Sequence, residues 1–325
     1  MPASQTSLGF PFSRVLLPRT RLVYIHLRNL LTDAKRDRAA RVSGYVAVWL
    51  PEEFVLLYLS SGELVNATVR DAKGRRAIAI ASALELVPSA PEDGEICFHE
   101  AGPEQLACMF ATQSTPAEPW PAGMAPQDPN VLFPYLMSTV FDGVLEIIAN
   151  NNVNYLTFRN GTVSRALLAT SSHGTVVDRV GKLFAREGRS GDLRVERWGI
   201  PGPLPVQAPP ALVQAYRELS VALVKRLVAH GRESAPAIAE HARHNLLAAH
   251  PALNCLSFSA RAPKEPLVDT AVLTVSVAAW IREVIWAAVD HDSLAPEALL
   301  HDLTWERRHM FQSAGPYDQL PWKVV

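Results

Sequence analysis

The feature that most constrains the fold is a glycine-punctuated apolar pattern that occurs twice. Residues 43–67 align without a gap with residues 142–166, at an offset of 99. In each segment a glycine opens an apolar run, a polar turn follows, and a second apolar run ends at a tight turn with another glycine. Self-similarity at a fixed offset indicates two copies of one structural unit. The aligned glycines are Gly44 with Gly143 and Gly62 with Gly161.

Each copy predicts an antiparallel meander. The Asn160-Gly161 pair lies between apolar runs, which favours a type I′ turn because both central residues of that turn need positive φ. Gly62 meets the same need in the first copy. We therefore expect structural turns at Gly44, Gly62, Gly143 and Gly161. The predicted strands cover 45–50, 54–59 and a run from 64 in copy one, and 144–149, 153–158 and a run from 163 in copy two.

The residues around each meander also match. Helices are expected after the meanders at 74–84 and 174–186, and closing strands at 95–99 and 192–197. A leading helix is expected from Leu22 in copy one and at 131–139 in copy two. The predicted class is α+β, with two tandem antiparallel-sheet repeats followed by an α-helical domain. The expected boundaries are 20–101 for the first repeat, 102–130 for a Pro-rich acidic linker, 131–199 for the second repeat and 208–315 for the helical domain.

Four helices are predicted in the last part of the chain. The first begins at Pro209-Pro210, where proline is tolerated at a helix start, and runs toward Gly231. The second covers about 235–249. The third, 267–289, is apolar nearly all round, so we expect it at the centre of the helical domain. The fourth begins near Ser293 and ends before Gly315.

Composition places the chain among ordinary globular proteins. Hydrophobic residues make up 48% and the net charge is −1, which excludes a disordered chain. Three widely spaced cysteines without a C-x-x-C exclude a disulfide framework and indicate a reducing compartment. The N-terminus lacks the apolar core of a signal peptide, and the longest apolar run, 271–281, is too short to span a bilayer. We expect a cytoplasmic protein without a membrane span.

Charge is unevenly distributed along the chain. From Arg14 to Arg41 there are eight basic and two acidic residues, whereas 77–158 contains ten acidic residues and no Lys or Arg. One interpretation is a solvated surface plus an acidic linker. The other is a docking face for a basic partner, or contact between the acidic and basic parts within the molecule.

A search for reactive motifs finds no P-loop, no G-x-G-x-x-G and no G-x-S-x-G. We therefore predict no catalytic residues and no cofactor. The candidate metal ligands are His241 and His244, three apart on one helix, and Glu306 and His309 on another. Di-iron bundles need two Glu-x-x-His steps, and this region has one. A metal- or ligand-binding enzyme or sensor built on these helices is the alternative hypothesis.

Two segments are candidates for interaction. Trp120 lies between two prolines in the acidic segment, where it can anchor a partner or fold back on its own domain. The basic stretch is interrupted by two aspartates and has no interleaved aromatics, so we do not expect nucleic-acid binding. Its candidate contact residues are Arg28, Lys35, Arg36 and Arg38.

The repeat unit resembles the PatA-like N-terminal domain, a bacterial domain family of unknown molecular function. The resemblance spans roughly 20–100 and 130–198. It implies bacterial signalling or motility and polarity systems, a small GTPase or a response regulator as partner, and no catalysis. The chain departs from the family pattern because it lacks an evident receiver-like phosphorylation site and ends in an unassigned helical region. The residues that carry the resemblance are Gly44, Tyr58, Gly62, Leu64, Val65, Ala67 and Gly74, then Gly143, Phe158, Gly161, Val163 and Ala166.

The hypothesis from the sequence is a non-catalytic regulatory or scaffold protein that acts through protein–protein interaction. A homodimer is one possible assembly, and the two copies are also expected to pack on each other as a pseudo-dimer.

Overall fold

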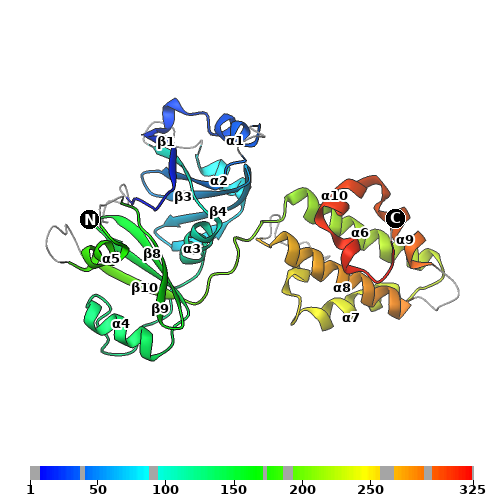
Figure 1. The fold of residues 1–325 in the computed structure, drawn as a ribbon. Helices are drawn as coiled ribbons and strands as arrows, with labels where there is room; N and C mark the ends of the chain where they lie inside the picture. Colours follow the sequence, from blue (N-terminus) through cyan, green and yellow to red (C-terminus); the bar gives the residue numbers. More distant parts are fainter. Residues whose placement is uncertain are drawn as a thin grey trace. The chain divides into compact units, whose positions relative to one another are not determined.

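The structure is a computed structural model, and it describes residues 8–36, 41–87, 94–170, 174–185, 193–256, 267–288 and 295–323. The chain divides into two units, Met1–Pro205 and Val206–Val325. Unit 1 contains two antiparallel sheets and unit 2 contains helices (Figure 1). This confirms the predicted α+β class with a helical C-terminal region.

The first sheet has the order β1-β6-β2-β3-β4-β5. Its strands are β1 (Arg14–Arg21), β2 (Gly44–Trp49), β3 (Phe54–Ser60), β4 (Glu63–Asp71), β5 (Gly74–Ile78) and β6 (Glu95–Glu100). Its outer face packs against α1 (Leu27–Arg36) and α2 (Ile80–Leu86), and a short 3₁₀ turn, η1 (Leu22–Tyr24), precedes α1. Every residue of β2 is buried, because both faces of this central strand are covered.

The second sheet has the order β10-β7-β8-β9. Its strands are β7 (Gly143–Ala149), β8 (Asn152–Arg159), β9 (Thr162–Leu167) and β10 (Arg194–Trp198). Its outer face packs against α4 (Pro129–Ser138) and α5 (Val176–Phe184). The helix α3 (Pro103–Ser114) connects the two repeats and lies between the sheets (Figure 1).

The strand registers confirm the duplicated architecture. Gly44 pairs with Leu59 in the first sheet, and Gly143 pairs with Phe158, the position 99 residues on, in the second. Both sheets have the same β-bulge before this pair, at Tyr58/Leu59 in the first and at Thr157/Phe158 in the second. A bulge fixes register and bend, so two segments that share its position share a backbone shape.

Of the four predicted turn glycines, Gly62 and Gly161 lie in turns, whereas Gly44 and Gly143 are the first residues of β2 and β7 at equivalent positions. Ser61-Gly62 has φ of 50° and 82°, and Asn160-Gly161 has φ of 50° and 73°, as a type I′ turn requires. A Cβ at Gly44 would lie 2.1 Å from the His99 carbonyl oxygen. The corresponding distance from Gly143 to the Trp198 carbonyl oxygen is 2.2 Å, so both closing strands approach too closely for a side chain.

The two copies bury the same sheet face against each other. One core cluster contains residues of both sheets together with α3, and equivalent positions from the two copies meet in it. The opposite faces form separate cores with the outer helices. The packing is that of a pseudo-dimer within one chain. Equivalent pairs in the shared core are Tyr45 with Val144, Phe54 with Val153, and Leu56 with Tyr155.

Two predicted element assignments are wrong, and one strand was not predicted. The segment 102–130 is not simply a linker, because it contains α3, which is buried on most sides. The expected helix at 74–84 is strand β5 followed by α2 from Ile80, because Gly74 (φ 102°) makes a turn that returns the chain along β4. The leading helix is preceded by an unpredicted strand, β1, which pairs with β6.

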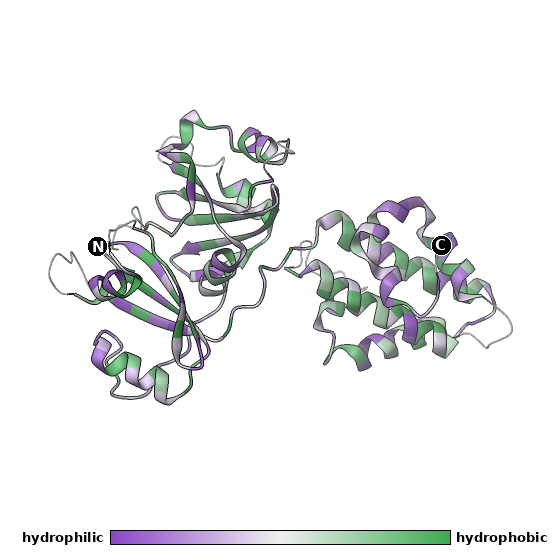
Figure 2. Ribbon diagram, in the orientation of Figure 1, coloured by the Kyte–Doolittle hydropathy of each residue, from purple (hydrophilic) through white to green (hydrophobic). Residues whose placement is uncertain are grey.

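Unit 2 is built around α8 (Thr270–Ala288), as predicted. The helix is longer than the apolar run 271–281 that was expected to be too short for a bilayer, and by length and composition alone α8 could cross a membrane. However, 56% of its apolar stretch is buried within the protein. Figure 2 shows apolar residues along this helix. The predicted fourth helix is two helices separated by a 3₁₀ turn. The other elements are α6 (Pro210–Ala229), α7 (Ala235–Leu246), η3 (Pro251–Leu256), α9 (Pro296–Thr304), η4 (Trp305–Arg307), α10 (Arg308–Ala314) and η5 (Pro316–Gln319).

Candidate functional site

The candidate site of unit 1 forms where the first turn of α3 meets the second sheet. Pro103 begins the helix, a position where its missing N–H costs nothing. In the same turn, Glu104 forms an ion pair with Arg165 on β9, and Thr157 Oγ1 on β8 donates to Glu104 Oε1 at 3.5 Å. These contacts place a carboxylate, a guanidinium and a hydroxyl at one corner between the repeats.

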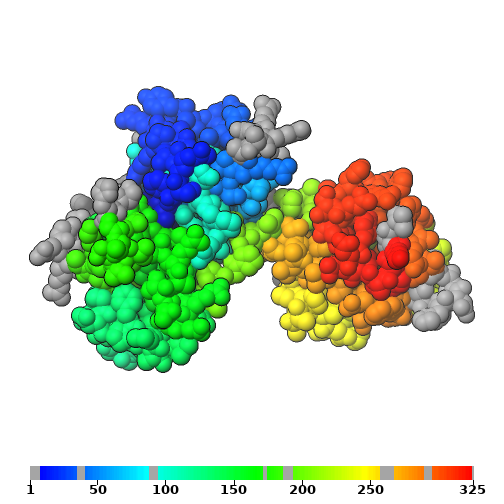
Figure 3. All heavy atoms as spheres, viewed as in Figure 1, coloured from blue at the N-terminus to red at the C-terminus, as the bar shows by residue number. Residues whose placement is uncertain are grey.

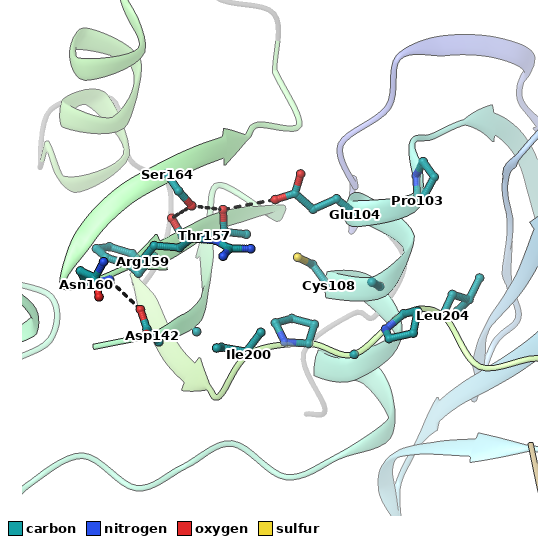
Figure 4. Close-up of a pocket in the computed structure, with 16 residues that line it drawn as sticks. Pro103, Glu104, Cys108, Asp142, Thr157, Arg159, Asn160, Ser164, Ile200 and Leu204 are labelled. Atoms are coloured by element: carbon teal, nitrogen blue, oxygen red, sulfur yellow. Dashed lines mark hydrogen bonds between the residues drawn. The ribbon is translucent and has the colours of Figure 1, made fainter. Parts of the chain in front are cut away.

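A pocket of about 400 Å³ lies on one side of Glu104, and we call it the α3 pocket. In Figure 4, Glu104 and Cys108 from α3 face Thr157 and Ser164 from the second sheet. Ser164 Oγ donates to the Thr157 carbonyl oxygen at 3.0 Å and lies 2.8 Å from Thr157 Oγ1. The pocket is lined by Pro103, Glu104, Ala107, Cys108, Asp142, Gly143, Thr157, Phe158, Arg159, Asn160, Ser164 and residues 200–204.

The α3 pocket is lined by one thiol and two hydroxyl groups, those of Cys108, Thr157 and Ser164. Burial, with a smaller contribution from the charge of Glu104, raises the pKa of the Cys108 thiol to about 12. Such a thiol stays protonated at neutral pH, and the thiolate is the reactive form. The Thr157 and Ser164 hydroxyls are hydrogen-bonded to each other and to neighbouring oxygens. The pocket therefore offers hydroxyl groups and a carboxylate as contacts for a ligand.

A larger groove of about 860 Å³ lies on the other side of Glu104, and we call it the edge groove. One wall follows the end of β9 from Arg165 to Leu168. The other is formed by the chain before β2, the end of β6 and the start of α3. Three arginines line it, Arg41, Arg165 and Arg179, together with two glutamates, Glu100 and Glu104.

A segment near the N-terminus holds the two repeats together. The Gly9 amide donates to the Asn151 carbonyl oxygen at 2.9 Å, and the Val153 amide donates to the Gly9 carbonyl oxygen at 2.8 Å, which ties this segment to the second sheet. Figure 3 shows the same contact between the blue N-terminal residues and the green second repeat. The Tyr45 hydroxyl, on the first sheet, donates to the Pro11 carbonyl oxygen at 2.9 Å.

A buried ion pair fixes the two repeats relative to each other. Arg75 on β5 donates to Glu146 on β7 at 2.6 Å and also pairs with Glu196 on β10 at 3.2 Å. The Glu146 side chain is 1% exposed and that of Arg75 is 14% exposed. Gln113 of α3 donates to the second Glu146 oxygen at 3.2 Å.

In this pair, burial and the charge of the partner shift the pKa of each group in opposite directions. Burial raises the pKa of Glu146, and the positive charge of Arg75 opposes that rise. Burial alone lowers the pKa of Arg75, but Glu146 and Glu196 raise it above its ordinary value, so the guanidinium stays charged. This buried ion pair between the copies holds the two sheets in one arrangement.

Several ion pairs in unit 1 bear on the interpretation of the charge distribution. Carboxylates of the acidic stretch pair with arginines from outside it, which supports contact within the molecule. Examples are Arg14 with Glu100, Arg19 with Glu95, Arg75 with Glu146, Arg165 with Glu104, and Arg197 with Glu118.

Trp120 folds back on its own domain, which was the alternative to a partner anchor. Its indole Nε1 donates to the Val195 carbonyl oxygen at 3.0 Å, and its ring lies against Tyr135 and Arg197. In the basic stretch, Arg28 is exposed on α1. Lys35 and Arg36 belong to the same helix, and Arg38 lies outside the described residues.

The metal-ligand candidates are not brought together. His241 is exposed on α7, with His244 on the same helix, while Glu306 lies on η4 and His309 on α10. Among the residues that the structure describes, no three His, Cys, Asp or Glu side chains are grouped so as to hold a metal ion.

Sequence reasoning missed the residues that build the candidate site. Glu146 carries a usable signal, because it is a charged residue inside the apolar run 144–149 and a buried carboxylate needs a partner. Glu104 and Arg165 carry none, since an exposed glutamate and arginine are ordinary surface residues.

A comparison of the chain with family models, with curated proteins and with solved structures found no match in any of the three. The resemblance of the repeat to the PatA-like N-terminal domain stays a prediction that rests on its motif residues. The candidate site is therefore interpreted from the chemistry of its own side chains.

Proposed function

We propose that this protein is a non-catalytic regulatory or scaffold protein that binds another protein at the corner between its two repeats. The observation that carries the proposal is the exposed Glu104–Arg165 ion pair, which lies between the α3 pocket and the edge groove where the two repeats meet. The buried Arg75–Glu146 pair links the same two repeats but lines neither cavity.

The two ion pairs differ in how easily a partner can replace them. The side chains of Arg165 and Glu104 are 60% and 45% exposed, and exposed ion pairs contribute about 0–1 kcal/mol. A partner's charged groups can therefore displace this pair at small cost. Breaking a buried pair costs about 3–5 kcal/mol, so the Arg75–Glu146 pair stays intact while the Glu104–Arg165 pair exchanges contacts. A preorganised surface with replaceable polar contacts favours recognition.

The partner class follows from the resemblance of the repeat to a bacterial signalling domain. We propose a small GTPase or a response regulator as the partner, in the cytoplasm, within a signalling or motility and polarity system. Association of two copies of the chain is a further proposal, and the same experiment addresses it because a second copy would be captured as well.

The test is affinity capture from the native cell, followed by binding measurements with the purified captured protein. Arg165→Glu reverses the charge at the groove wall. Arg226→Glu is the matched control, since Arg226 is an exposed arginine paired with Asp302 in unit 2. We expect one partner to bind the wild type and the control equally, and Arg165→Glu at least about tenfold more weakly. Equal binding by all three proteins would remove the site from the proposal.

A further inference from the structure

The two copies differ at one edge of their sheets. In the first sheet the outer edge of β4 is paired with β5, from Ala67 with Ile78 to Asp71 with Gly74. In the second sheet the equivalent strand, β9, is last in the order. In the part of the chain that the structure describes, no strand pairs with its outer edge. Strand edges expose unpaired N–H and C=O groups, so β9 offers a template for another strand.

Side-chain hydrogen bonds stop the second copy from forming its own fifth strand. The Ala169 amide is bound by the Asn154 side-chain oxygen at 3.0 Å, and the Thr170 carbonyl oxygen accepts from Arg179 at 2.9 Å. Asn154 takes the place of Val55, which in the first copy pairs with Val69 as part of the continuing ladder. The Asn154 side chain therefore replaces main-chain pairing with β8 at Ala169. The chain leaves the second sheet after β9, whereas the equivalent strand β4 continues and turns back into β5.

The edge groove lies along this open edge. Its wall includes four consecutive residues, 165–168, and consecutive residues of a strand point to alternate faces, so the groove borders the strand edge. Ser164 and Arg165 of β9 are exposed and Ala166 and Leu167 are half-buried, whereas the equivalent residues of β4, Val65 to Thr68, are buried. Pairing with β5 covers the last two of these, Ala67 and Thr68.

The pseudo-symmetry of the copies gives the same location. In the first copy, β5 reaches across to β7 and β10 of the other sheet through Arg75, which contacts Glu146 and Glu196. A strand in the edge groove would face the corresponding strands of the first sheet, β2 and β6. The groove wall opposite β9 includes Ser43 and Glu100, at the start of β2 and the end of β6.

The groove has an excess of positive charge for its occupant. Both of its glutamates are already paired, Glu100 with Arg14 and Glu104 with Arg165. Arg41 and Arg179 form no ion pair with any residue that the structure describes. The Arg179 Nε is buried without an acceptor.

We propose that the edge groove receives an extended, carboxylate-bearing segment of a partner protein, which pairs with β9 as the fifth strand of the second sheet. Addition of a peptide to a sheet edge gives affinity through main-chain hydrogen bonds and selectivity through side-chain contacts. This inference rests on the proposed function as a protein-binding module and specifies its site and partner chemistry. A second copy fits poorly, because β9 against β9 would bring basic residues together.

The test uses a fluorescent seven-residue probe, acetyl-Glu-Val-Glu-Ile-Glu-Val-Thr-amide, with the full chain at low salt and fluorescence anisotropy as readout. A second probe replaces each glutamate by lysine. Two further probes carry N-methyl groups on one strand edge or on the other. We expect the acidic probe to bind. The lysine probe and one of the two N-methyl probes should bind at least about tenfold more weakly, and the other N-methyl probe should bind like the parent.

Protein variants locate the binding site. Arg41→Glu should weaken acidic-probe binding at least about tenfold, and the control Arg226→Glu should leave it unchanged. Amide exchange of residues 165–167 should slow when the probe is bound. The proposal is overturned if the acidic probe shows no binding at about 1 mM, if both N-methyl probes bind like the parent, or if β9 protection appears only with concentration-dependent dimerisation. A partner that binds at Arg165 without protecting β9 would also overturn this inference while leaving the proposed function standing.

Discussion

The buried Arg75–Glu146 pair gives the sharpest quantitative prediction. Replacing Arg75 by methionine removes the cation but keeps much of the side-chain volume. Glu146 then keeps neutral donors, among them Gln113 at 3.2 Å and the Tyr155 hydroxyl at 3.5 Å, in a site where it is 1% exposed. A buried charge without its partner costs about 3–5 kcal/mol, so Arg75→Met should destabilise unit 1 by that amount.

The double variant Arg75→Met with Glu146→Leu should recover most of this loss. Replacing both members of a buried pair by apolar residues of similar volume is often neutral or stabilising. Glu196, the second partner of Arg75, has a side chain 32% exposed and can hydrate when the arginine is gone. The free energy of unfolding of the double variant should therefore lie within roughly 1 kcal/mol of the wild type.

Hydrogen exchange measured by mass spectrometry on the full chain is the assay. Peptides covering β5 and β7 report the loss in unit 1, and peptides covering α8 in unit 2 serve as the internal reference. The reasoning is refuted if Arg75→Met costs less than about 1 kcal/mol, or if the double variant is as unstable as the single one.

The same carboxyl predicts a pH dependence. Burial raises the folded-state pKa of Glu146, so the folded state holds this proton more tightly than the unfolded chain does. Its contribution to stability is full below the ordinary glutamate pKa of about 4.3 and is lost as pH rises through the raised folded value. The difference in free energy of unfolding between the wild type and the Glu146→Gln variant should therefore shift in favour of the variant as pH rises. A pH-independent difference would contradict the assignment.

Three more predictions concern packing, burial and a core hydrogen bond. Gly143→Ala should cost about 1–3 kcal/mol in urea unfolding, because its Cβ would lie 2.2 Å from the Trp198 carbonyl oxygen, whereas Gly202→Ala meets nothing within 4 Å and should be nearly neutral. The three buried cysteines should resist Ellman's reagent in the native protein and react fully after unfolding. The reason is that burial raises the pKa of each thiol, to about 12 at Cys97 and Cys108. Reaction of one equivalent in the native state would contradict this. Trp280→Phe should cost unit 2 about 0.5–1.5 kcal/mol beyond lost packing, because it removes the 2.9 Å hydrogen bond from the indole to the Ala239 carbonyl oxygen; a thermal unfolding midpoint equal to wild type would count against it.

The duplicated meander was predictable because its signals are local. A type I′ turn requires positive φ whatever lies around it. The residues Asn160-Gly161 and Gly62 therefore predict the two hairpins without any information from distant parts of the chain. The α8 core position was predictable for a similar reason, since a helix apolar all round needs burial on every side.

The elements that were missed depend on long-range contacts. Strand β5 carries two arginines and forms because it pairs with β4 and because Arg75 finds Glu146 in the other repeat. Helix α3 is buried on most sides between two sheets, so no apolar stripe marked it within the acidic segment. Tertiary context overrides local propensity in both cases.

The candidate site could not be predicted for the same reason. Glu104 and Arg165 are 61 residues apart and meet only because the two sheets pack with equivalent faces inward. The open edge of β9 is visible only by comparing the folded copies, because a fifth strand extends the first sheet beyond β4 and none extends the second beyond β9 among the described residues.

The most direct test of the account is amide hydrogen exchange of β9 in the purified full chain, alone and with the captured partner. We predict that the amides of Ala166 and Leu167 in β9 exchange much faster than those of the equivalent Ala67 and Thr68 in β4, which pair with β5, and that partner binding slows them to the rate seen in β4. Equal protection of β4 and β9 in the free protein, or a bound partner that leaves β9 unprotected, would contradict it.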